Sequence, residues 1–226
     1  MKKIGIFVLG LVLLGLLLAP SAAFAQISSY NADFQVVNLN DSAPADITIS
    51  FYDKSGSVVA SVTDSIVAGG SNTYSPLPDS VPVGFDGSVV IASTEPVASI
   101  TNVKGNTSEY GSSYSSFSGG SDSVSLPLIN RDFYGINTWF NVQNTGSSET
   151  NVTISYSGKP TCNQTALIQP YAAATFEQEP YSCLGSAYNG AAKITAGAGG
   201  EVAAVVMQVF SGGLLAYNGF DAGGAD

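Results

Sequence analysis

The stretch that decides the fold is Phe34-Gln-Val-Val-Asn-Leu-Asn followed by Ile47-Thr-Ile-Ser-Phe-Tyr, because a similar pair of segments returns later in the chain. The second pair is Phe140-Asn-Val-Gln-Asn-Thr-Gly and Val152-Thr-Ile-Ser-Tyr-Ser, at offsets of 140 − 34 = 106 and 152 − 47 = 105 residues. Apolar and polar residues alternate in the second segment of each pair, as in a strand with one buried face. A long repeat with this periodicity predicts two copies of one all-β module.

The rest of the sequence fits around these two copies. Six or seven short strands per module, with turn residues between them, predict two tandem antiparallel β-sandwich domains of immunoglobulin-like size. The expected boundaries are a signal peptide (1–25), module one (26–104), a linker (105–122) and module two with a trailing tail (123–226). The Cys…Trp…Cys order of antibody domains is absent, because Trp139 precedes both cysteines.

The N-terminus has the order of a secretory signal peptide. Two lysines precede a continuous apolar run, and Ala23-Phe24-Ala25 supplies a small-residue site that places the cut before Gln26. An uncleaved N-terminal anchor is the alternative, although the apolar run is short for a full span. We therefore expect the protein to be secreted or held at the cell surface, with no membrane span after cleavage.

The charge of the chain excludes two classes of partner. The net charge is −10, and removing Lys2 and Lys3 with the signal peptide gives −10 − 2 = −12. Nucleic acid and anionic lipid both require a basic surface, so we expect neither as a partner.

The two cysteines, Cys162 and Cys183, both fall in module two. In an exported chain a pair this close in sequence predicts a disulfide, worth about 3 kcal/mol for a loop of this size. A zinc site is a weak alternative, because the chain contains no histidine.

The absence of histidine also argues against an enzyme. No Gly-x-Ser-x-Gly segment occurs, and no base is present to activate a serine as in a catalytic triad. A pair of catalytic carboxylates remains an alternative, but the acids lie at turns and strand ends. We expect a non-enzymatic protein without a catalytic residue, metal site or cofactor.

Calcium is the one ion for which the sequence offers candidate ligands. Asn38, Asn40, Asp41 and Asp46 could gather at one loop and supply oxygen ligands. The competing interpretation, which we favour, is that these residues form turns.

Two groups of aromatic residues are candidates for binding. Tyr110, Tyr114 and Phe117 lie in the Gly/Ser/Tyr-rich linker, where no core is expected, and they predict a contact surface. A second group could form a sugar-stacking platform on module two, although core packing is the commoner role for a tryptophan in an alternating strand. Its members are Trp139, Tyr171, Tyr181 and Tyr188.

Residues 123–129 predict a strand that has no counterpart before Phe34 once the signal peptide is removed. Module one is then expected to have an open sheet edge, which is a template for another strand. Leu126, Leu128 and Ile129 make this segment a candidate edge or donor strand. It could close module one within the chain, which we favour, or be exchanged between chains.

The strand and turn pattern resembles the tandem β-sandwich modules of bacterial secreted and cell-surface proteins. The resemblance covers residues 33–104 and 123–210 and rests on Phe-x-Val-x-Asn, the Ile/Val-Thr-Ile-Ser strand, Ser-Val-Val-Ile-x-Ser and Glu-Pro-Val-Ala. It implies fold and location only. We expect a structural or adhesive component of the cell surface or extracellular matrix that contacts copies of itself or other surface components. A carbohydrate- or protein-binding accessory module is the alternative.

Overall fold

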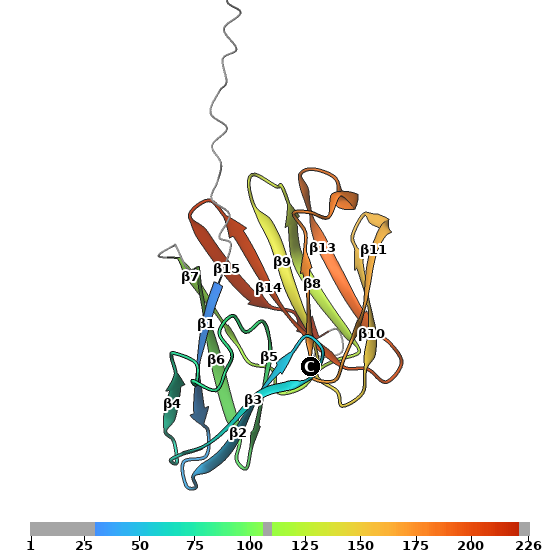
Figure 1. The fold of residues 1–226 in the computed structure, drawn as a ribbon. Coiled ribbons are helices and arrows are strands. Elements are labelled where there is room, and N and C mark those ends of the chain that lie inside the picture. Colours follow the sequence, from blue (N-terminus) through green and yellow to red (C-terminus); the bar gives the residue numbers. More distant parts are fainter. Residues whose placement is uncertain (1–29, 106–109, 222–226) are drawn as a thin grey trace, which may run out of the picture.

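The computed structural model describes residues 30–105 and 110–221, and over these residues the protein is all-β with antiparallel sheets (Figure 1). Four sheets form two pairs that follow one another along the sequence, and we keep the names module one and module two for them. Module one consists of β1 (Tyr30–Asn38), β2 (Ala45–Asp53), β3 (Val58–Ile66), β4 (Ser71–Tyr74), β5 (Gly87–Ser93), β6 (Val97–Gly105) and β7 (Gly111–Ser115).

Module two repeats this order and adds a strand at each end. It consists of β8 (Ser123–Arg131), β9 (Asn137–Asn144), β10 (Thr150–Tyr156), β11 (Lys159–Ile168), β12 (Ala173–Glu177), a short 3-10 helix η1 (Ser182–Leu184), β13 (Tyr188–Ala196), β14 (Val202–Phe210), β15 (Gly213–Asn218) and β16 (Phe220–Asp221). Among the described residues no helix is long and apolar enough to cross a membrane.

The sheet topology of the two modules matches strand for strand. In module one the sheets have the orders β4-β1-β6-β7 and β3-β2-β5. In module two the orders are β12-β9-β14-β15 and β11-β10-β13-β8-β16. β14 is a central strand, as its apolar residues on both faces predict. The additional strands of module two, β8 and β16, both lie beyond β13.

Each pair of sheets encloses its own apolar core because one face of each inner strand is apolar. Along β2 the alternate residues Ile47, Ile49 and Phe51 are buried in the core of module one. Along β10 the alternate residues Val152 and Ile154 are buried in the core of module two. The alternation in the sequence therefore sets which face of each sheet is buried.

A buried asparagine confirms the repeat at the level of single hydrogen bonds. The Asn38 side chain donates to the backbone carbonyls of Ala43, Ile66 and Val67 at 2.8–3.2 Å. In module two Asn144 is almost fully buried and donates in the same way to three carbonyls. These carbonyls belong to Ser148, Ile168 and Gln169.

The two modules contact each other through a shared seam. β7 lies beside β15, and the Asn218 side-chain amide donates to the Ser115 carbonyl at 2.9 Å. A small apolar cluster next to this pair joins Val103 of module one to Met207 and Leu214 of module two. The seam thus combines hydrogen bonds with buried apolar contacts.

The seam corrects the expectation of a linker at 105–122. Residues 111–115 form β7 and pair with β6, and the backbone of Ser121 bonds with that of Val202. Residues 106–109 lie outside the described residues. The sequence Gly-Ser-Ser-Tyr-Ser forms a strand because β6 and Tyr114 hold it in place, although its own residues carry no apolar alternation.

Candidate functional site

The modules differ most at one sheet edge. In module two β13 lies between β10 and β8, whereas its counterpart in module one, β5, pairs only with β2 within the described residues. An unpaired strand edge presents N–H and C=O groups that can bond another strand. The structure therefore has the unpaired edge that the sequence predicts for module one, and module two covers only its start, where the buried Ser88 side chain donates to the Tyr171 carbonyl.

The segment expected to close this edge does not do so. β8, which contains residues 123–129, pairs with β13 and with the short β16, both in module two. The favoured prediction of closure of module one within the chain is therefore wrong. Leu126 and Ile129 are fully buried in the core of module two, and Leu128 is 41% exposed. β8 serves as a core strand there because its inward side chains are apolar.

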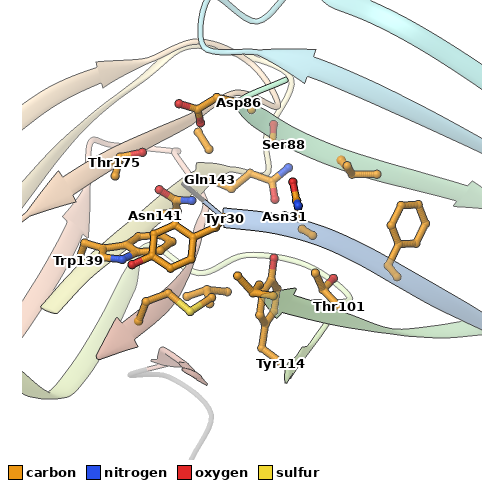
Figure 2. Close-up of a pocket in the computed structure, with 18 of the residues that line it drawn as sticks. Tyr30, Asn31, Asp86, Ser88, Thr101, Tyr114, Trp139, Asn141, Gln143 and Thr175 are labelled. Atoms are coloured by element: carbon orange, nitrogen blue, oxygen red, sulfur yellow. The ribbon is translucent and has the colours of Figure 1, made fainter. Parts of the chain in front are cut away.

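A groove of about 2520 Å³ lies along the open edge, between module one and the outer face of β9, β12 and β14 (Figure 2). Pockets for small ligands measure about 300–1,000 Å³. The groove is thus large enough for an extended polymer chain.

The floor of the groove is the inner face of β6, which has polar side chains at two positions where module two has apolar ones. The pairing Phe34–Thr101 in module one corresponds to Phe140–Val206 in module two, so Thr101 is the counterpart of Val206. Ser99 corresponds in the same way to Ala204. Val206 and Ala204 are buried, whereas Thr101 and Ser99 are partly exposed. Threonine and serine are close in size to valine and alanine, but their hydroxyl groups can hydrogen-bond water. They therefore lower the free-energy cost of exposing this face of β6 to solvent.

A tyrosine stands at the same place in each module. Thr101 pairs with Tyr114 and Val206 pairs with Tyr217, so the two tyrosines are counterparts. The Tyr217 hydroxyl donates to the Leu128 carbonyl of β8 at 2.7 Å and accepts from the Leu128 N–H at 3.2 Å. Burial raises the pKa of Tyr217 to about 12, and it raises that of Tyr114 too. Both hydroxyls therefore keep their proton at neutral pH.

The segment after β7 repeats the segment after β15. The Ser116 N–H bonds the Ser99 carbonyl at 2.9 Å, just as the Gly219 N–H bonds the Ala204 carbonyl at 2.7 Å. The next residues are Phe117 and Phe220, and Phe220 pairs with β8. Phe117 lines the groove. In module two β8 lies between β13 and β16. Module one has the counterparts of both neighbours, which are β5 and residues 117–118.

The far wall of the groove belongs to module two and mixes an aromatic contact with amides. Tyr30, at the start of β1, packs against Trp139 of β9 with 5.4 Å between ring centroids. Asn141 and Gln143 line the groove from β9 (Figure 2), and the Gln143 side chain donates to the Tyr171 carbonyl at 3.2 Å. The Asn141 Oδ1 atom is buried and accepts no hydrogen bond from the described residues. A polypeptide or sugar in the groove could supply the missing donor.

The charge along the groove is negative. Its lining contains six carboxylates and a single lysine, Lys104. The carboxylates belong to Asp33, Asp79, Asp86, Asp132, Glu177 and Glu179. Val83 and Tyr134 on the rim are 106% and 91% exposed. An exposed apolar and aromatic rim is typical of an interaction surface.

The predicted contact residues of the linker all lie at this site. Tyr110, Tyr114 and Phe117 line the groove, and Tyr114 also packs into the cluster between the modules. Tyr110 is 49% exposed and lies near Gly212 of module two.

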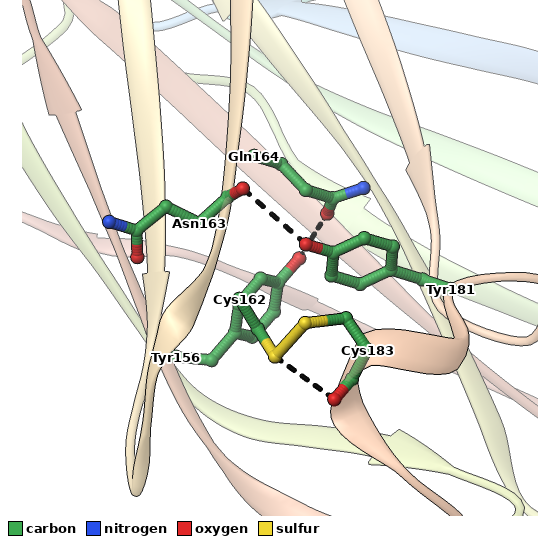
Figure 3. The surroundings of a disulfide bond; sticks show 6 residues. All are labelled: Tyr156, Cys162, Asn163, Gln164, Tyr181 and Cys183. Atoms are coloured by element: carbon green, nitrogen blue, oxygen red, sulfur yellow. Dashed lines mark hydrogen bonds between the residues drawn. A yellow bond between two sulfur atoms is a disulfide. The ribbon is translucent and has the colours of Figure 1, made fainter.

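The predicted disulfide between Cys162 and Cys183 is present and ties β11 to η1 (Figure 3). Beside it Tyr156 bonds the Gln164 side chain, and the Tyr181 hydroxyl donates to the Asn163 carbonyl at 3.4 Å. This cluster reinforces module two.

The predicted sugar-stacking residues do not form one platform. Trp139 and Tyr171 line the groove, whereas Tyr181 and Tyr188 pack around Tyr156 near the disulfide. Tyr188 is buried.

The candidate calcium loop consists of turns held by amides. The Asn40 N–H donates to the Asn38 side chain at 2.9 Å, and the Asn40 side chain donates to Glu95 at 2.6 Å. No cluster of three or more Cys, Asp or Glu side chains that could hold a metal occurs among the described residues.

Comparisons with protein families, curated proteins and solved structures find no match to this chain. The groove is therefore the feature that points to a function. Its polar residues Thr101, Asn141 and Gln143 were not predicted, because on an alternating strand they have the pattern of solvent-facing positions. The match of Tyr114 with Tyr217 comes from the strand register, because their separation of 217 − 114 = 103 residues departs from the sequence offset of 105–106.

Proposed function

We propose that this chain is an exported, non-enzymatic structural or adhesive protein of the cell surface or extracellular matrix, made of two tandem β-sandwich domains of immunoglobulin-like size. Its first module joins it to another polypeptide by accepting a strand at β5. The observation that carries this proposal is the strand position that β8 fills in module two and that stands open beside β5 in module one. Strand addition at a sheet edge supplies main-chain hydrogen bonds, and pockets for alternate side chains give specificity.

Carbohydrate binding in the same groove is the second candidate. Tyr30 and Trp139 offer aromatic surface, and Asn141 and Gln143 offer amides beside it. This combination could stack against a sugar and hydrogen-bond its hydroxyls.

One experiment separates the two candidates. The mature chain (26–226) is titrated with labelled nine-residue peptides of alternating apolar and polar residues, and it is applied in parallel to a glycan array. Saturable peptide binding without glycan binding supports strand acceptance. Glycan binding without peptide binding supports the second candidate, and the absence of both overturns both.

A further inference from the structure

The direction and register of a strand bound beside β5 can be inferred from β8, which occupies the equivalent place in module two. β8 runs antiparallel to β13, with Leu126 opposite Ala192 and Val124 opposite Ile194. Val124 and Leu126 point into the core and are almost fully buried, as is Ile129. β8 is therefore a template for an occupant of the open position.

The β5 register transfers this template to module one. Ile49 pairs with Ile91 as Ile154 pairs with Ile194, so Ile91 is the counterpart of Ile194. Val89 is likewise the counterpart of Ala192, since it pairs with Phe51. An antiparallel strand beside β5 would place apolar side chains opposite these two residues.

The segment at the corresponding place before β1 falls within the expected signal peptide. Subtracting the repeat offset of 106 from the β8 bounds gives residues 17–25, which belong to the signal peptide expected to be removed. The described strands of the chain are all paired within their own sheets. No described strand of the chain is therefore free to fill the position, which points to a segment of another polypeptide.

The charge of the groove selects among such segments. Six carboxylates and one lysine line it. Three of the carboxylates form ion pairs, Asp33 with Lys104, Asp86 with Lys54 and Asp132 with Arg131. The three other carboxylates leave a net negative charge, so a segment with positive charge is attracted and a negative one is repelled. β8 itself ends in Arg131, whose side chain donates to the carbonyls of Glu179 and Gly185.

Resting on the proposed function, we infer that module one binds an extended, positively charged segment of a partner polypeptide, antiparallel to β5. The segment is apolar opposite Val89 and Ile91, and it is flanked on its second edge by residues 117–118. The Tyr114 hydroxyl bonds its backbone as the Tyr217 hydroxyl bonds Leu128.

A variant chain that carries its own copy of the β8 strand tests whether the partner segment binds beside β5. A copy of residues 123–135 is fused directly before Tyr30 of the mature chain, which reproduces the spacing between β8 and β9. The copy should fill the open position, raise the melting temperature of module one by about 5 °C or more, and abolish binding of a labelled peptide with the sequence of residues 123–131. The matched control carries serine at the copied positions of Val124, Leu126 and Ile129, and it should still bind the peptide.

Three further probes test the direction of the bound segment, its charge and the role of Tyr114. A peptide of reversed sequence should bind at least about ten-fold more weakly, and a lysine-extended peptide should bind more tightly than a glutamate-extended one at low salt. Tyr114→Phe should weaken binding about five-fold. Tyr181→Phe, beside the disulfide and outside the groove lining, is the matched control and should leave binding unchanged.

The outcomes separate this inference from the proposed function. If peptides bind the mature chain but the fusion does not block them, or if the reversed peptide binds equally well, strand acceptance stands and the position or direction inferred for it is wrong. If no peptide binds under any condition, the proposed function fails as well. If the fusion blocks peptide binding and Tyr114→Phe weakens it, the results support both the proposed function and this inference.

Discussion

Module two is a closed version of module one, and the difference between them is one strand position. Both modules share strand order, register and the buried asparagine, yet β13 has a partner on each side and β5 has one. The polar floor at Ser99 and Thr101 accompanies the open edge, and its counterparts Ala204 and Val206 accompany the closed one. The comparison teaches that the inner face of β6 is polar at these two positions in the module with the open edge, whereas the equivalent face of β14 is apolar in the module with the closed edge.

The largest expected effect is on β8. Leu126→Ala should lower the free energy of unfolding of module two by about 2–5 kcal/mol, because Leu126 is fully buried. Leu128→Ala is the matched control and should change it by no more than about 0.5 kcal/mol. Hydrogen exchange of β10 and β2 amides reports on each module separately. Equal destabilisation of β2 would mean that β8 supports module one as well.

Removing the disulfide should have the next largest effect. Replacing Cys162 and Cys183 with serine should cost about 3 kcal/mol, because the 21-residue separation then no longer constrains the unfolded chain. The loss should appear in module two, which contains both cysteines. Denaturant titration with and without reductant measures it, and unchanged midpoints for wild-type protein would contradict the prediction.

A smaller effect compares the two counterpart tyrosines. Tyr217→Phe should cost module two about 1 kcal/mol, because its hydroxyl bonds both backbone groups of Leu128. Tyr114→Phe should cost the free protein less, since β8, whose backbone Tyr217 bonds in module two, has no described counterpart beside β5. Thermal unfolding of both variants makes the test, and a reversed order would break the assigned correspondence.

The smallest expected effect is the acid sensitivity of module one. Hydrogen bonds from Tyr74 and Asn72 lower the pKa of Asp64 below its ordinary value of 3.8. The ionised carboxylate therefore stabilises the folded state above about pH 4, and this contribution is lost as the pH falls through the lowered pKa. Asp64→Asn should flatten the decline in stability of module one between about pH 5 and pH 2. An identical decline in the variant would assign the acid sensitivity to other groups.

The sequence predicted the all-β fold, the disulfide and the open edge, because each depends on local alternation or on the repeat. It did not predict β7, since Gly-Ser-Ser-Tyr-Ser becomes a strand only through its pairing with β6. It placed residues 123–129 in module two but favoured their pairing with the edge of module one, because alternation shows that a strand has an apolar face but does not show which sheet it joins. The groove wall at Asn141 and Gln143 depends on how the modules dock, which no local pattern encodes.

The seam between β7 and β15 has a mechanical consequence. Hydrogen bonds from Ala216 to Ser112 and from Asn218 to Ser115, together with the Tyr30–Trp139 contact, lock the modules at one angle. A partner strand pulled along β5 would then pass its load through these contacts into module two. The disulfide between Cys162 and Cys183 lies in the module that carries that load.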